Sequence, residues 1–145
     1  MRSLARSLVL VLGLCTASTA MSGAQEVDKV TAGGWITGTP SGARASFGVV
    51  ARDPATPSGN LNFVDHGDGI HVKSESITSY TIVDATTRRI EGTASIDGMS
   101  GFTFTATLVD AGEPGTADSF ALTLSSGYSA SGTLQGGNVQ IHALP

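Results

Sequence analysis

The residues best suited to chemistry lie in one short acidic stretch. Asp110, Glu113 and Asp118 fall within Asp-Ala-Gly-Glu-Pro-Gly-Thr-Ala-Asp, between two runs of alternating apolar residues. Calcium takes about six to eight oxygen ligands, and carboxylates on a glycine-containing loop supply several of them. The spacing lacks the alternating acids of an EF-hand, however. Two hypotheses remain: a calcium site, or a polar loop in which Asp110 and Asp118 accept backbone N–H bonds. The second is favoured.

Histidine and serine residues form weaker candidate sites. His66 and His71 flank a tight turn that also contains Asp68, but a zinc site needs a third or fourth ligand, and nothing in the sequence brings His142 near. No Gly-x-Ser-x-Gly elbow marks a nucleophile, so an extracellular hydrolase is a disfavoured alternative. We expect no catalytic residues, and no cofactor other than the calcium considered above.

Two further features have a structural and a functional interpretation. Trp35, the single tryptophan, follows Gly33 and Gly34; it would either stack on a sugar ring or act as a structural anchor, in the core or over a strand edge, and we expect the structural role. Arg88 and Arg89 form a charged pair near a turn, which we interpret as protecting an exposed strand edge.

The elements that must position these residues are β-strands. Alternation with a period of two recurs along the chain; in the clearest run Phe102, Phe104, Ala106 and Leu108 share one face, opposite three threonines. Tyr80 and Ile82 share a face in the same way. Glycine- and proline-containing turns separate these runs at intervals of roughly 8 to 14 residues. The pattern predicts roughly ten short strands in a single antiparallel β-sandwich, with a closed β-barrel as the alternative.

The first residues predict export. Arg2 and Arg6 precede an apolar core, followed by small residues up to Ala24. This pattern is typical of a cleavable signal peptide over residues 1–24, with cleavage after Ala24, or as second choice after Ala20. The apolar run is shorter than the roughly 20 residues that span a bilayer, so no integral membrane segment is expected after cleavage. We further expect a lead-in over residues 25–29 and one domain over residues 30–145.

Charge and cysteine usage exclude several classes. The leader contains two of the 8 bases and none of the 12 acids, so the exported chain carries a net charge of about −6 and shows no basic stripe. Nucleic acid and anionic membranes, which need lysine and arginine to neutralise phosphate, are disfavoured partners. Cys15 is the only cysteine and lies within the leader. Leu14 before it is bulky for a lipoprotein signal, so lipidation is not expected, and the exported domain has no disulfide.

Several segments, taken in order, resemble a known family. They are Thr31-Ala32-Gly33-Gly34-Trp35-Ile36, Ala45-Ser46-Phe47-Gly48-Val49-Val50, Gly59-Asn60-Leu61-Asn62-Phe63-Val64-Asp65, Phe102-Thr103-Phe104-Thr105-Ala106-Thr107, Asp110-Ala111-Gly112-Glu113-Pro114-Gly115 and Ser131-Gly132-Thr133-Leu134-Gln135-Gly136-Gly137-Asn138-Val139-Gln140-Ile141-His142. Their order and spacing over nearly all of residues 30–142 resemble the post-COAP-1 domain of exported bacterial proteins. That domain follows choice-of-anchor modules in larger surface proteins and also occurs alone behind a signal peptide.

The resemblance implies an exported β-domain without assigned catalytic residues. We identify no anchor module or sorting signal beside it, so it does not by itself predict surface attachment. The expected role is a secreted, non-catalytic binding or structural module at the cell surface or outside the cell. A calcium-stabilised extracellular domain and an extracellular hydrolase remain the two alternatives.

Overall fold

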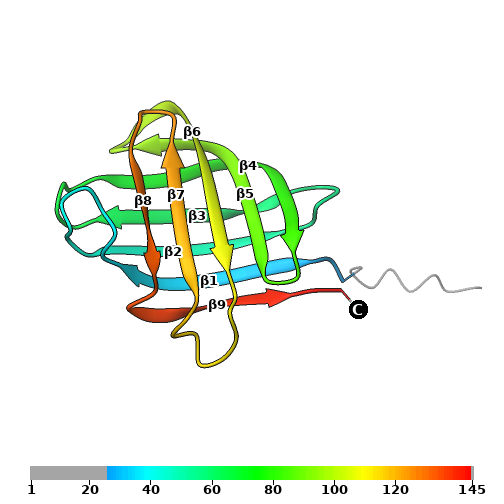
Figure 1. The fold of residues 1–145 in the computed structure, drawn as a ribbon. Coiled ribbons are helices and arrows are strands. Elements are labelled where there is room, and N and C mark those ends of the chain that lie inside the picture. Colours follow the sequence, from blue (N-terminus) through cyan, green and yellow to red (C-terminus); the bar gives the residue numbers. More distant parts are fainter. Residues whose placement is uncertain (1–25, 145) are drawn as a thin grey trace, which may run out of the picture.

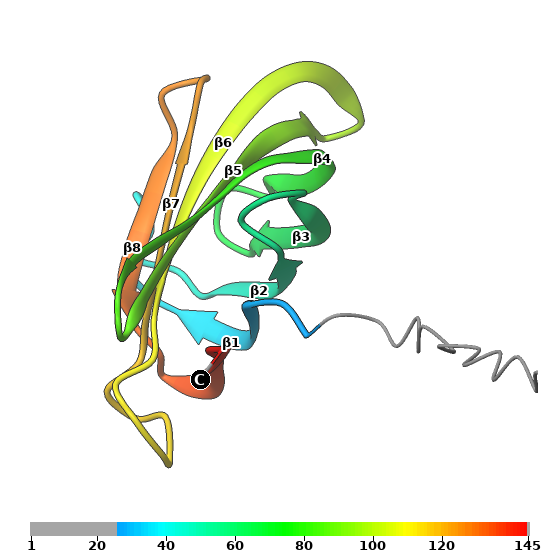
Figure 2. The same cartoon turned by 90° about the vertical axis from the view of Figure 1, so that its right-hand side faces the viewer.

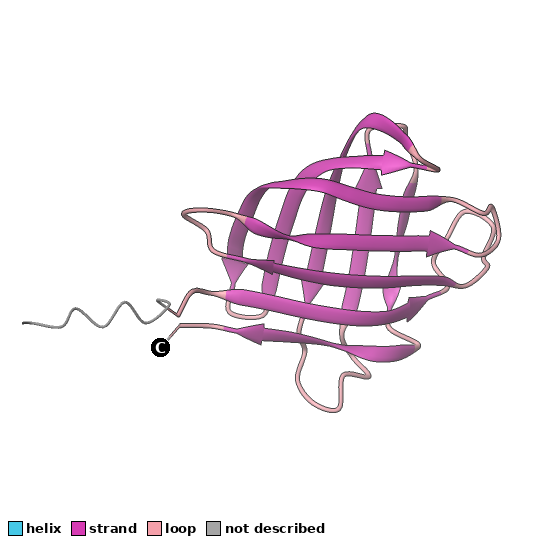
Figure 3. Ribbon diagram, turned by 180° about the vertical axis from the view of Figure 1, so that it is seen from behind, coloured by secondary structure: helices cyan, strands magenta, loops and turns pink. Residues whose placement is uncertain are grey.

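The computed structural model describes residues 26–144, and within this range the secondary structure consists of β-strands (Figure 3). The strands are β1 Lys29–Ile36, β2 Ala45–Arg52, β3 Ser58–Asp65, β4 His71–Asp84, β5 Thr87–Ile96, β6 Met99–Val109, β7 Ser119–Leu124, β8 Ser129–Thr133 and β9 Gly136–His142. The prediction of an all-β fold is confirmed. The strand count is nine instead of about ten, because the segment around Val72 and the segment around Tyr80 and Ile82 form one long strand, β4.

All nine strands belong to one antiparallel sheet that curls on itself. Its order is β8-β7-β6-β5-β4-β3-β2-β1-β9, so strands β1 to β8 follow one another and β9 returns to pair with β1. The curl places β1, β2, β3 and β9 across β5, β6, β7 and β8, as seen from two sides (Figures 1 and 2). The result is a half-barrel whose two halves face each other, intermediate between the predicted sandwich and barrel.

The sheet bends along β4, its longest strand. Val72 and Lys73 at the start of β4 pair with β3, whereas pairing with β5 continues to Asp84. The β4–β5 register shifts at Ser74/Ser76, Ile77/Ser79 and Ile82/Asp84. Extra residues in one strand of a pair bend that strand and increase its twist. Because of these irregularities, the single strand β4 can pair with β3 in one half of the half-barrel and with β5 in the other.

Aromatic side chains join the two halves in the core. The Phe47 ring on β2 stacks on Phe120 of β7 with centroids 4.0 Å apart. Phe63 of β3 contacts both Phe120 and Tyr128. The predicted inward face of β6 is confirmed at Phe104, Ala106 and Leu108, which are buried, and Phe47 of β2 and Phe63 of β3 are buried as well. Ile82 is an exception: it was predicted to be inward with Tyr80 but is 48% exposed, because it lies at an open end of the half-barrel.

Close backbone approach fixes the corner where β8, β9 and β1 meet. The Ser131 amide donates to the Gly38 carbonyl, and the Gln135 amide donates to the Trp35 carbonyl. A Cβ atom at Gly34 would collide with the Gly136 carbonyl oxygen, so this approach requires glycine. The corner therefore depends on small residues that the strand pattern alone does not predict.

Candidate functional site

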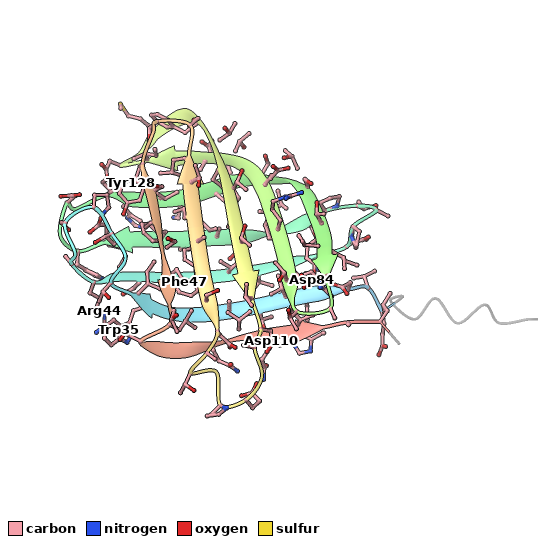
Figure 4. All side chains as sticks on the ribbon, viewed as in Figure 1. Trp35, Arg44, Phe47, Asp84, Asp110 and Tyr128 are labelled. Atoms are coloured by element: carbon pink, nitrogen blue, oxygen red, sulfur yellow. The ribbon has the colours of Figure 1, made fainter. Side chains whose placement is uncertain are left out.

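A pocket that could hold a ligand lies at one end of the half-barrel. It has a volume of about 540 Å³, within the range of about 300 to 1,000 Å³ typical of small-molecule sites. Asp84 lies at this end, far from Trp35 at the other (Figure 4). We call it the end pocket; it lies between the β2–β3 loop, the β4–β5 turn and the two ends of the described chain. Its lining residues are Val27, Asp28, Asp53, Pro54, Ala55, Ile82, Asp84, Ala85, Arg88, Ala143 and Leu144.

The walls of the end pocket are mainly apolar and incompletely covered. Ile82 is 48% exposed and Leu144 is 50% exposed, and both line the pocket together with Val27. Burying an aliphatic side chain of this size is worth about 1.5 to 3 kcal/mol. The described chain leaves that stabilisation unused at the open end, so an apolar molecule could gain it by binding.

The end pocket also includes a buried ion pair. The Arg88 guanidinium donates from Nε to Asp28 Oδ1 at 2.8 Å and from Nη2 to Asp28 Oδ2 at 2.9 Å. Its Nη1 donates to the carbonyls of Asp84 and Thr87, and the Tyr80 hydroxyl donates to Asp28. Asp28 and Arg88 are only 3% and 2% exposed. Such a network fixes the positions of both charges.

The network shifts the titration of its members. Burial alone raises the pKa of Asp28, but hydrogen bonds from Arg88 and Tyr80 together with the guanidinium charge outweigh it, so the pKa lies below its ordinary value. The pKa of Tyr80 is raised because the hydroxyl is buried and donates to the Asp28 carboxylate. The site therefore presents a neutral ion pair, and no proton donor or acceptor tuned to neutral pH.

Neither member of this ion pair stands out in the sequence as a buried residue. Asp28 was assigned to a lead-in over residues 25–29, yet it is buried, and Lys29 already belongs to β1. Arg88 was interpreted as protecting an exposed edge beside Arg89, yet only Arg89 is exposed. The alternation of the strands could have indicated their burial. Asp28 lies two residues before Val30, and Arg88 two residues before Ile90, so each shares a face of its strand with an apolar residue that is fully buried.

The acidic residues 110, 113 and 118 line up along the free edge of β9. Asp118 accepts hydrogen bonds from the amides of Ala111 and Val139 at 2.7 and 2.8 Å. Asp110 accepts hydrogen bonds from the amides of Gly112 and Ile141 at 3.1 and 3.0 Å. Each aspartate thus fixes the turn, as the loop hypothesis expected, and also caps an N–H group on the side of β9 that faces away from β1. The loop, labelled at Asp110 in Figure 4, covers this edge.

Glu113 completes this contact through side chains alone. Its carboxylate accepts hydrogen bonds from Asn138 Nδ2 at 3.1 Å and from Gln140 Nε2 at 3.4 Å. Each of the three acids therefore has its own N–H donors. No group of three histidine, cysteine, aspartate or glutamate side chains within residues 26–144 is arranged to hold a metal ion.

This geometry gives a prediction about calcium. Because Asp110, Glu113 and Asp118 are held by separate donors along β9, we expect the thermal midpoint of unfolding to be the same with millimolar calcium and with EDTA. Calorimetry on the metal-stripped protein checks this, since a ligand of the folded state raises the midpoint. A rise that appears with calcium, and that Glu113→Gln abolishes, would restore the calcium hypothesis.

The histidines are separated from one another in their contacts. His66 Nε2 lies 3.0 Å from Ser46 Oγ, whereas the main-chain amide of His71 donates to Asp97 and His142 pairs with Lys29 across β9 and β1. The Ser46–His66 pair has the separation of a nucleophile and a base, but no carboxylate among residues 26–144 is hydrogen-bonded to the His66 ring. A triad needs that third group to orient the imidazole.

Trp35 has a structural environment. The Arg44 guanidinium lies over its ring at 4.5 Å from the centroid, and the two residues lie together at one end of the molecule (Figure 4). The ring also covers Gly136, the residue opposite Trp35 on β9. An arginine over one tryptophan face is a favourable cation–π contact. These contacts accord with the predicted role of Trp35 as an anchor that covers a strand edge.

A short row of basic residues also forms only in the folded chain. Arg52 on β2 and His142 on β9 both lie opposite Lys29 on β1. Their neighbours Val30 and Ala51 are fully buried, so Lys29 and Arg52 lie on the outer side of the sheet. We call these three residues the cationic row. They line a second hollow of about 500 Å³, which shares Val27, Ala143 and Leu144 with the end pocket. The sequence showed no basic stripe because each residue comes from a different strand.

Two further observations concern the whole described chain. Residues 26–144 include no helix with the length and apolar character needed to cross a bilayer, while the predicted leader over residues 1–24 lies outside the described residues.

Comparison with family models, with curated proteins and with solved structures found no match in any of the three. The resemblance to the post-COAP-1 domain therefore stays a prediction.

Proposed function

We propose that this chain is an exported, non-catalytic binding module that holds a small apolar molecule in its end pocket. The observation that carries the proposal is the open pocket of about 540 Å³ in which Ile82 and Leu144 remain half-exposed beside a buried ion pair. A ligand-sized concavity with apolar walls and a few fixed polar groups is the usual form of a small-molecule site. The predicted signal peptide supports the assignment to an exported protein.

The chemistry of the pocket supports binding over catalysis. Asp28 and Arg88 satisfy each other through two hydrogen bonds, and Tyr80 donates to the same carboxylate. None of these groups is poised to give or take a proton near neutral pH. The calcium and hydrolase alternatives have no comparable observation in their favour, because their residues are engaged elsewhere or lack a third partner.

Ile82→Gln tests the proposal. We expect the protein to bind the neutral fluorescent probe phenylnaphthylamine, with its emission rising as the probe leaves water. Ile82→Gln should weaken that affinity by about tenfold, since burial of an aliphatic side chain contributes about 1.5 kcal/mol. Fluorescence titration of the full-length wild-type protein and of the full-length Ile82→Gln variant measures the two affinities for the probe.

Val83→Gln is the matched control. Val83 neighbours Ile82 in β4 and is equally exposed, at 48%, but it does not line the end pocket. Its substitution should leave the affinity for the probe unchanged. If the probe does not bind, or if both glutamine variants lose the same affinity, the end pocket is not a ligand site.

A further inference from the structure

We infer that the ligand of the end pocket is an anionic amphiphile, whose tail enters the pocket and whose carboxylate or phosphate binds to the cationic row. This inference rests on the proposed function and adds the chemical class of the ligand. Its basis is one juxtaposition: the apolar pocket and the hollow beside the cationic row share the lining residues Val27, Ala143 and Leu144.

The cationic row brings basic residues of three strands together. Arg52, Lys29 and His142 occupy directly paired positions on three neighbouring strands, where side chains lie roughly 5 Å apart. Like charges placed directly opposite each other destabilise a sheet. Glu26 is the one carboxylate among the described residues that line this hollow. A bound anion would reduce the repulsion between Arg52 and Lys29.

The charges around the two hollows also define an orientation. Asp53 and Asp84 line the end pocket, and Asp53 Oδ1 is held by the amides of Ala55 and Thr56, while Asp84 is held by Thr86. These fixed carboxylates disfavour an anionic group in the end pocket. Arg52 and Lys29 attract it in the second hollow, which Leu144 also lines, and there guanidinium and carboxylate or phosphate can form paired hydrogen bonds. The tail therefore faces the pocket and the head group faces the row.

A pair of probes with the same ring system separates head-group recognition from tail binding. Anilinonaphthalene sulfonate has the aromatic skeleton of phenylnaphthylamine plus one negative charge. We expect wild-type protein to bind the sulfonate probe more tightly than the neutral one. Arg52→Gln and Lys29→Gln should each weaken the sulfonate affinity about fivefold, as expected for one partly exposed ionic contact, and should leave the neutral probe unaffected.

Arg89→Gln is the matched control, because it removes one charge from an exposed position that lines neither hollow. It should change neither affinity. If wild-type protein binds both probes equally and the Arg52 and Lys29 variants do not discriminate between them, the inference fails while the binding module stands. If neither probe binds, the proposed function fails first.

Competition identifies the form of the ligand. Decanoate should displace the sulfonate probe at lower concentration than decanol does, and inorganic phosphate alone should not displace it, because binding needs both tail and head group. Displacement by phosphate alone would reduce the site to a simple anion site. Co-sedimentation with vesicles of anionic phospholipid tests the alternative of a membrane surface. If the protein sediments with the vesicles only when Arg52 is present, and decanoate does not displace the sulfonate probe, the partner is a membrane surface and the inference of a single bound amphiphile is wrong.

Discussion

Replacing Arg88 by methionine is expected to lower the free energy of unfolding by about 4 kcal/mol. Arg88 is 2% exposed and donates two hydrogen bonds to the buried carboxylate of Asp28. Removing one member of a buried ion pair costs about 3 to 5 kcal/mol, because the other charge stays buried without compensation. Chemical denaturation of the wild type and the variant at neutral pH measures the difference.

Two further variants separate charge burial from general damage. Arg89→Met makes the same chemical change at the exposed neighbouring residue and should cost less than about 0.5 kcal/mol. The double variant Asp28→Leu with Arg88→Met should recover much of the stability, because apolar replacement of a whole buried pair is often neutral. Equal losses at Arg88 and Arg89 would show that the ion pair does not stabilise the fold.

Acid should reduce the difference between wild type and Arg88→Met. The pKa of Asp28 is held below its ordinary value of 3.8 in the folded protein, so its contribution is fully present above that value and is lost as the pH falls further. Below about pH 4 the wild type therefore loses the stabilisation of the ion pair. In Arg88→Met the unpaired carboxyl can take up a proton, which removes its penalty.

Asp118→Ala is expected to cost about 3 kcal/mol, the second largest effect. The Asp118 side chain is fully buried and accepts hydrogen bonds from the amides of Ala111 and Val139. Its loss leaves two backbone donors unsatisfied, each costing about 1 to 3 kcal/mol, part of which water entry recovers. Denaturation measures the total, and hydrogen exchange should show faster exchange at the Val139 amide.

Glu113→Ala is the comparison for Asp118→Ala. Glu113 belongs to the same loop but is exposed and is bonded only to the side chains of Asn138 and Gln140. Its removal should cost less than about 0.5 kcal/mol. If the two alanine variants are equally stable, the contact between the acidic loop and β9 does not stabilise the edge.

That contact also explains how the sheet protects its free edge. The Val139 and Ile141 amides lie on the side of β9 away from β1 and donate to Asp118 and Asp110. An uncovered edge strand presents unpaired N–H and C=O groups that can pair with another chain. The acidic loop replaces the missing neighbouring strand with side-chain oxygens. Protection of this edge therefore explains the acidic residues of the loop, which the sequence alone offered as a calcium site.

The strands themselves were predictable because alternation is a local property of the chain. Phe104, Ala106 and Leu108 alternate with threonines, and all three are buried; the proline-containing segments Asp53–Pro54 and Pro114–Gly115 lie in loops. Ile82 follows the same alternation but remains half-exposed. The alternation predicts correctly which side of the sheet Ile82 faces. How far its side chain is exposed to water depends instead on its position at the open end of the half-barrel.

The sequence by itself determined an all-β chain, its main turns and most of the inward-facing residues, because each of these depends on neighbours only a few positions apart. Tertiary structure decided which distant residues meet: Asp28 with Arg88, Asp118 with Val139, and Lys29 with Arg52 and His142. Those contacts depend on strand order, on the curl introduced along β4 and on the return of β9 to β1. One antiparallel pattern is compatible with many such arrangements, and the packing of the whole core selects among them.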